Sequence, residues 1–167
     1  MAAFTAMDIA NFYVQLSNDL PETDITNLKL NKLCYYAQGW CLALLNHPLF
    51  DNEIQAWDYG PVIPEVYHTY KVCGKSPIGE PADVFDESRL STDELNLLID
   101  VFNSYAKYAP SELVTMTDAD GGPWRKAYQE RMNNPIDLEV IKEYFKRSDE
   151  LKGMQLNLTP ENVVEYA

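Results

Sequence analysis

Hydrophobic side chains recur at helical spacing through most of this chain, and one segment carries them on two faces. This segment begins near Asp24 or Thr26 and ends at about Leu45. One of its stripes contains Leu30, Leu33, Cys34, Ala37, Cys41 and Leu44, and the opposite stripe contains Leu28, Tyr35 and Leu42. A helix that is apolar on two sides is buried on two sides. We therefore expect this segment to form the central helix of the domain.

Other segments are apolar on one helical face, and several carry helix-start or helix-stop signals. Thr5 with Asp8 and Ser91 with Glu94 have the spacing of capping boxes. The further predicted helices cover residues 6–20, 64–73, 92–109, 111–116 and 124–132, and a last one begins at Asn134 or Asp137. Within the central helix, Gly39 costs about 0.5–1 kcal/mol relative to Ala. We expect it to allow the close passage of another backbone.

Residues 53–59 alternate in the way that is typical of a short strand, and Gly60-Pro61 is expected to end it. The periodic pattern weakens after Gly153, which predicts a domain over residues 1–153 and a tail over residues 154–167. The predicted fold class is mostly α: a compact single-domain helical bundle of about six helices with at most a minor short β element.

The charge balance narrows the range of partners. The chain has 13 basic and 26 acidic side chains, a net charge of −13. Binding to nucleic acid depends on Lys and Arg, so nucleic acid is not an expected partner. No apolar run is long enough to span a membrane, and no signal region opens the chain, so we expect a cytoplasmic protein.

Acidic residues are densest between Glu80 and Asp100, where Arg89 is the only basic side chain. This segment has two interpretations: a solubilising surface, or a docking face for a basic protein.

Few side chains are suited to covalent chemistry. The two histidines and three cysteines form no CxxC, HExxH or paired-His motif, so we predict no metal and no cofactor. An odd number of widely spaced cysteines favours reduced thiols. A Cys73–His68 pair is the one arrangement that could support nucleophilic chemistry. Because groups that titrate near neutral pH are so few, we do not expect an enzyme.

Aromatic residues are abundant, with three Trp and eleven Tyr. Such side chains supply either core mass or interface anchors. The candidate interaction residues are six aromatic side chains and one proline that stiffens their turn: Tyr36, Trp40, Trp57, Tyr59, Pro61, Tyr67 and Trp124. One interpretation is core packing. The other is that the turn from Trp57 to Pro61 presents part of this cluster to a partner protein. The sequence does not decide between them.

Three sequence runs point to a known family. They are Leu-Lys-Leu-Asn-Lys-Leu-Cys-Tyr-Tyr-Ala-Gln-Gly-Trp at residues 28–40, Ala-Trp-Asp-Tyr-Gly-Pro-Val at residues 56–62, and Gly-Pro-Trp at residues 122–124. Together with Tyr67, Leu113 and Thr117, they closely resemble the Panacea family, which includes the SocA-type antitoxin domain. Many relatives lie in prophages. The similarity covers about residues 3–146.

The resemblance implies a small helical antitoxin that neutralises a toxin by direct protein binding. It also implies a role as an adaptor that delivers the toxin to a ClpXP-type protease, which is how SocA acts. One departure is visible. Family members often read Thr-His-x-Glu before Gly-Pro-Trp, whereas here Thr117 is followed by Asp118-Ala119-Asp120.

The leading hypothesis is an antitoxin whose partner is a toxin encoded nearby, which the charge balance predicts to be basic. One alternative is a prophage-encoded interaction protein that acts on a host or phage factor without a cognate toxin. A second alternative is a small Cys/His-dependent hydrolase.

Overall fold

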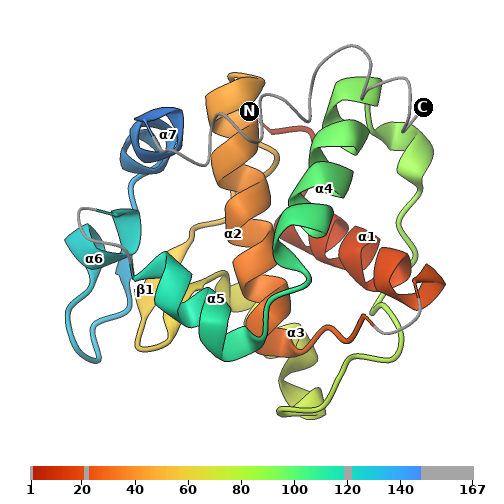
Figure 1. Ribbon diagram of the computed structural model, residues 1–167, viewed down its shortest axis with the longest axis horizontal. Coiled ribbons are helices and arrows are strands. Elements are labelled where there is room, and N and C mark those ends of the chain that lie inside the picture. The colour runs from red at the N-terminus through yellow and green to blue at the C-terminus, as the bar shows by residue number, and fades with distance from the viewer. Residues whose placement is uncertain (1, 21–22, 119–121, 148–167) are drawn as a thin grey trace.

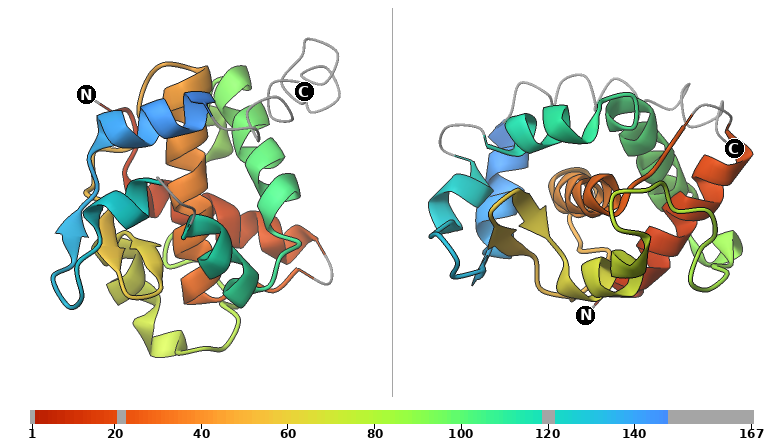
Figure 2. Two further views of the ribbon diagram at one scale, coloured as in Figure 1. Left: turned by 60° about the vertical axis from the view of Figure 1, so that its left-hand side comes forward. Right: turned by 90° about the horizontal axis from the view of Figure 1, so that it is seen from below.

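The central helix α2, Asn27–Leu44, organises the fold. The computed structural model describes residues 2–20, 23–118 and 122–147. Every residue from Lys29 to Leu42 is buried. Viewed close to its axis, α2 is surrounded by the other elements (Figure 2). This arrangement confirms the prediction that the helix with two apolar stripes is the centre of the domain.

Six other α-helices in the described residues surround α2, and the mostly α fold class is confirmed (Figure 1). The bounds of these six helices are Ala6–Asp19 for α1, Pro64–Tyr70 for α3, Thr92–Tyr105 for α4, Pro110–Thr117 for α5, Pro123–Ala127 for α6 and Leu138–Arg147 for α7. Five of them, α1, α3, α4, α5 and α7, pack directly on α2. Short 3-10 helices cover Lys71–Cys73 (η1) and Glu87–Arg89 (η2). Both predicted capping boxes are present at the starts of α1 and α4.

The β element is a small antiparallel sheet of three strands in the order β2-β1-β3. Its strands are Gln55–Trp57 (β1), Gly60–Val62 (β2) and Asn134–Pro135 (β3). The sequence predicts that Gly60-Pro61 ends the strand. In the structure these two residues instead begin β2, which folds back on β1 as a hairpin and places Pro61 opposite Ala56. Gly60 closes the hairpin at φ +107, a conformation that glycine adopts without strain.

The helix predicted over residues 124–132 ends earlier, at Ala127. Tyr128 is extended, and Arg131 and Asn133 have positive φ values that turn the chain into β3. Asn134 therefore lies in a strand. Asp137, the other predicted start, begins the last helix: its side chain accepts a hydrogen bond of 2.7 Å from the Glu139 amide. The predicted tail over residues 154–167 lies outside the described residues.

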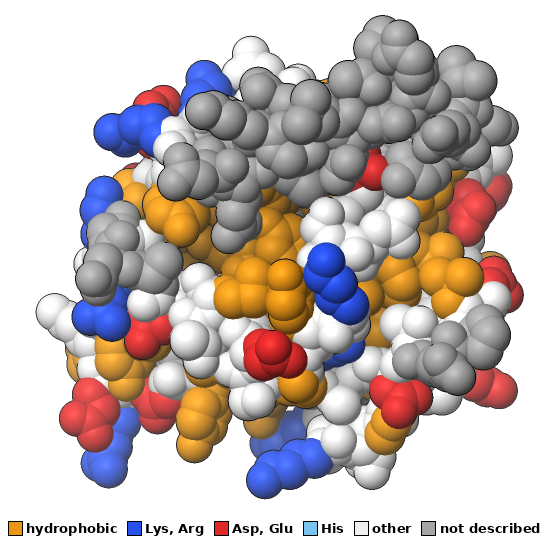
Figure 3. Space-filling view, viewed as in Figure 1, with side chains coloured by type: hydrophobic (Ala, Val, Ile, Leu, Met, Phe, Trp, Pro, Cys, Tyr) orange, Lys and Arg blue, Asp and Glu red, His pale blue; other side chains and the backbone are white. Residues whose placement is uncertain are grey.

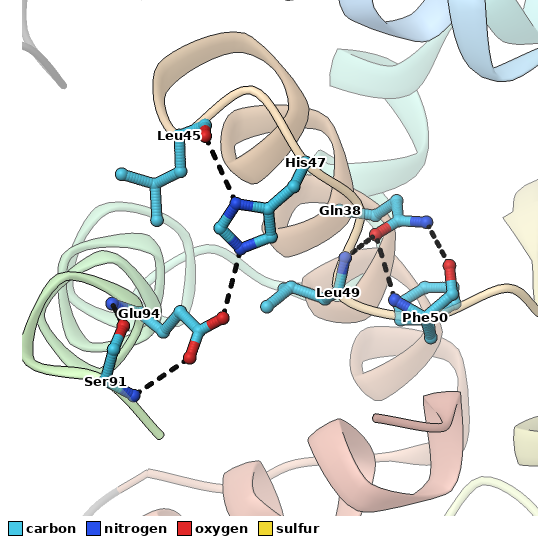
Figure 4. Close-up of polar contacts among 7 residues, drawn as sticks. All are labelled: Gln38, Leu45, His47, Leu49, Phe50, Ser91 and Glu94. Carbon is cyan, nitrogen blue, oxygen red and sulfur yellow. Dashed lines mark hydrogen bonds and ion pairs between the residues drawn. The ribbon is translucent and has the colours of Figure 1, made fainter. Parts of the chain in front are cut away.

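Polar side chains on α2 bind the backbone of the segments around it. Gln38 is completely buried, and its amide accepts from the Leu49 amide and donates to the Phe50 carbonyl, each at 2.8 Å (Figure 4). Beside it, His47 Nε2 lies 3.0 Å from Glu94, which also accepts from the Ser91 amide at the start of α4 (Figure 4). The loop after α2 is thus attached both to α2 and to α4.

Lys32 is the most unusual of these polar side chains, because it is a fully buried lysine. Its Nζ donates to the Pro61 carbonyl at 3.1 Å. Burial lowers the pKa of Lys32 to about 7. Lys32 lies between Leu28 and Tyr35 on the face of α2 that carries the second apolar stripe, and this position places it in the interior.

Gly39 faces a side chain rather than a backbone. A Cβ atom added at Gly39 would overlap the ring of Phe145, with Cζ only 2.8 Å away. The predicted passage of another backbone is therefore wrong: the phenyl ring from α7 occupies this space. Phe145 also contacts Trp40 edge-to-face, with ring centroids 4.9 Å apart.

Gly39→Ala should destabilise the fold by about 2 kcal/mol, because the ring of Phe145 must move in a packed core. Urea denaturation followed by circular dichroism measures this change. Gly79→Ala is the matched control, since nothing lies within 4 Å of a Cβ at Gly79. Equal stability of the two variants would contradict the packing assignment.

Lys32→Met should remove a pH dependence of stability. In the folded protein burial lowers the pKa of Lys32 to about 7, whereas the ordinary pKa of a lysine is 10.5. Between these values the unfolded chain binds more protons, so the free energy of unfolding rises with pH, by on the order of 5 kcal/mol over the window. Below pH 7 the cost of the buried charge is present in full.

Urea denaturation of wild type and Lys32→Met from pH 7 to pH 10 tests this expectation. The wild type should gain stability relative to the variant across this window. Lys126→Met, at an exposed lysine, controls for general effects of losing a charge. Parallel stability curves for wild type and Lys32→Met would show that the buried ammonium is not the cause.

Candidate interaction groove

A groove of about 910 Å³ lies beside the β1–β2 hairpin. Its walls come from the first turns of α2, from the hairpin, from α3 with the segment after it, and from α5. We call it the hairpin groove. Its hydrophobic lining is Leu28, Trp57, Tyr59, Val62, Tyr67 and Val114. A space of this size with a mostly apolar lining is typical of a binding site.

The aromatic residues singled out in the sequence divide between the core and this groove. Tyr36, Trp40, Pro61 and Trp124 are buried. Trp40 is completely inaccessible, and its Nε1 donates to the Tyr105 hydroxyl at 2.9 Å. The ring of Tyr36 stacks on the same tyrosine with centroids 3.8 Å apart. These contacts place Tyr36 and Trp40 in the core.

Trp57, Tyr59 and Tyr67 are brought together at the groove. Trp57 and Tyr67 are half-buried and meet edge-to-face, with ring centroids 4.9 Å apart. Tyr59, at the tip of the hairpin, is 70% exposed. His68 is exposed beside them and lies 5.3 Å from Tyr67, centroid to centroid.

Hydrogen bonds hold the turn of the hairpin in place. The Trp57 indole donates to the Gln55 side chain at 2.8 Å. The Trp57 carbonyl accepts from the Trp124 indole at 2.7 Å, and Asp58 accepts from the Tyr128 hydroxyl at 2.8 Å. Trp124 and Tyr128 are themselves stacked, with centroids 4.4 Å apart. A turn fixed in this way loses little conformational entropy when a partner binds.

The outer edge of β2 is occupied by side chains of α2. Lys32 binds the Pro61 carbonyl, and the Ile63 amide donates to Asn31 at 2.9 Å. An edge strand can recruit a partner strand only through free backbone groups. Because these two groups are already paired, the hairpin groove is suited to recognising side chains rather than to adding a strand.

The three thiols differ in exposure: two are buried, and Cys73 is half-buried. Cys34 and Cys41 are buried in α2, and burial raises the pKa of the Cys41 thiol to about 12 and that of Cys34 further still. Such thiols are poor nucleophiles at neutral pH. Within the described part of the chain, no hydrogen bond joins Cys73 to His68. No group of three His, Cys, Asp or Glu side chains there could hold a metal ion.

The acidic segment has one buried member. Most of its carboxylates are exposed, but Asp100 is only 1% exposed, within α4. Asp100 therefore does not belong to the acidic surface that the sequence predicted. Within the ranges that the structure describes, no helix combines the length and apolar character needed to cross a bilayer.

Comparison with known proteins gives two matches. The family model described as "Antitoxin SocA-like, Panacea domain" matches residues 30–125, which include most of α2, the hairpin and most of the residues that line the groove. The curated protein Antitoxin SocA from Caulobacter vibrioides (strain NA1000 / CB15N) is 30% identical over 115 residues, which cover 64% of this chain and 60% of that protein. No solved structure matches. With the family model covering more than half of its length, this chain belongs to the SocA-like antitoxin family that carries the Panacea domain.

Proposed function

We propose that this protein is an antitoxin that neutralises a toxin by binding it directly, without covalent chemistry. Two findings support the proposal: membership of the SocA-like antitoxin family, and a preformed groove with aromatic walls. Four residues of the sequence run at positions 56–62, on which the family resemblance partly rests, line the groove: Trp57, Asp58, Tyr59 and Val62.

The observation that carries the proposal is the exposure of Tyr59 on a fixed turn. An exposed tyrosine that protrudes from a rigid hairpin, with Trp57 and Tyr67 beside it, has the composition of a protein-interaction hot spot. The hydrogen bonds from Trp124 and Tyr128 hold this turn without any contribution from a partner. The partner therefore meets a surface that does not need to be ordered on binding.

Charge supports the prediction of a basic toxin. The chain has a net charge of −13, and the exposed carboxylates of residues 80–94 face solvent. A negative field of this kind accelerates the approach of a positively charged protein. We propose that this field governs encounter, while the aromatic groove supplies the contact that holds the complex.

Tyr59→Ala and Trp57→Ala should weaken the complex with the toxin encoded next to this chain. Loss of an aromatic hot spot should cost about 2 kcal/mol, or roughly 30-fold in Kd. Isothermal titration calorimetry measures the affinity, and survival of cells that co-express toxin and antitoxin measures neutralisation. Val84→Ala is the matched control, because Val84 is 81% exposed but does not line the groove.

If both aromatic variants fold and neutralise the toxin as well as wild type, the hairpin is not the contact. If the wild-type protein neither binds nor neutralises a neighbour-encoded protein, the antitoxin function is itself wrong. In that case the alternative of a prophage-encoded protein that acts on a host or phage factor takes its place.

We further propose delivery of the bound toxin to a ClpXP-type protease. Blocking and delivery differ in the lifetime of the toxin. Delivery predicts that the toxin half-life shortens several-fold when this protein is co-expressed, and that the effect disappears in cells without the ClpX unfoldase. Immunoblotting after protein synthesis is stopped measures this half-life. A toxin that is silenced yet equally long-lived in both strains would show simple blocking.

A further inference from the structure

Resting on the proposed function, we propose that the hairpin groove binds an extended, acidic segment of the toxin that carries an aromatic or large aliphatic side chain. The apolar side chain would insert between the aromatic walls of the groove. The acidic groups of the segment would face Lys71, the first residue of η1, and Lys75, which follows η1; both line the groove.

The charge of the groove differs in sign from that of the whole chain. Its charged lining residues are Lys71, Lys75 and Asp58, a balance of one positive charge in a chain of net charge −13. Both lysines are exposed, and no ion pair to either is found among the residues that the structure describes. Basic side chains gather at the lower edge of the face in Figure 3, near α3. The groove is therefore suited to an acidic ligand.

Asp58 does not cancel this preference. Its carboxylate already accepts a hydrogen bond of 2.8 Å from the Tyr128 hydroxyl, so it helps to hold the turn. The lysines lie on a different wall of the groove and come from a different element. A bound segment thus meets two lysines that form no ion pair with the described residues, and a carboxylate that already holds the turn by a hydrogen bond.

The volume of the groove and the paired backbone groups at the edge of β2 favour a peptide segment that is recognised through its side chains. A volume of about 910 Å³ exceeds what a single ion or side chain fills. Figure 3 shows further hydrophobic side chains across the middle of this face, where α2 and α5 lie. Because Asn31 and Lys32 already pair with the edge of β2, the segment gains affinity from its side chains and not by extending the sheet.

A toxin that is basic overall can still bind the groove through an acidic segment, because net charge and local charge act over different distances. The long-range field depends on the net charge of both proteins, whereas the groove senses only the few charges within contact range. An acidic segment on a basic toxin would also discriminate against other basic proteins, which lack a group to pair with Lys71 and Lys75.

The test is a charge reversal at both lysines in the full-length protein. Lys71→Glu/Lys75→Glu should weaken binding of the neighbour-encoded toxin roughly 10-fold or more, since two attractive contacts become repulsive. Lys126→Glu/Lys146→Glu is the matched control: it makes the same change in net charge at exposed lysines that do not line the groove. The control should change affinity by no more than about twofold. Both double variants alter the net charge equally, so any effect of net charge on the encounter rate is the same in both.

A peptide array identifies the segment directly. Overlapping 15-residue peptides that cover the toxin sequence are probed with wild type and with both double variants. We expect wild type and the control to capture peptides that combine Asp or Glu with an aromatic or large aliphatic residue, and the groove variant to lose them. Capture of basic peptides, equal capture by all three proteins, or no capture of any peptide would overturn the inference. If the intact toxin is still bound in those cases, the antitoxin function stands.

Discussion

The fold depends on one constraint: a helix with no exposed side must bring its polar residues into the interior. Lys29 to Leu42 are all buried, and among them Asn31, Lys32 and Gln38 carry groups that need hydrogen-bond partners. An unpaired polar group in the interior costs several kcal/mol. These side chains bind backbone groups of the segments after α2, at Leu49, Phe50, Pro61 and Ile63. The polar residues of α2 therefore determine where the loop and the hairpin pack.

This constraint also explains the two different faces of the hairpin. The outer edge of β2 is held by α2 through Asn31 and Lys32, which removes an exposed strand edge that would otherwise promote non-specific pairing. The turn is held from the other direction by Trp124 and Tyr128. With both sides fixed, Tyr59 can protrude into solvent without loosening the hairpin. Residues 28–40, 56–62 and 122–124, which carry the family resemblance, thus form one connected structure.

Residue patterns predicted most of the helices because their signals are local. The capping boxes and the two-sided stripe of α2 are read over a few turns, and both are confirmed. The predictions are wrong where a contact with a residue far away in the sequence determines the local structure. Phe145 fills the space at Gly39, and the extended Tyr128 reaches Asp58, some 70 positions earlier in the chain. The groove could not be predicted either, since it forms only when α2, α3, α5 and the hairpin come together. The two roles considered for each aromatic residue are likewise separated only by the packing.

The division of charge over the molecule gives the proposed binding mode its logic. The acidic residues between 80 and 94 belong to the segment between η1 and α4, which includes η2, and to the start of α4, whereas Lys71 and Lys75 line the hairpin groove. If the groove were as acidic as the rest of the surface, any basic protein would be attracted to it. A locally positive groove inside a negative field instead admits a partner that is basic overall but acidic at one segment. Selectivity then comes from requiring both properties of the same toxin, which neither net charge nor aromatic contact could achieve alone.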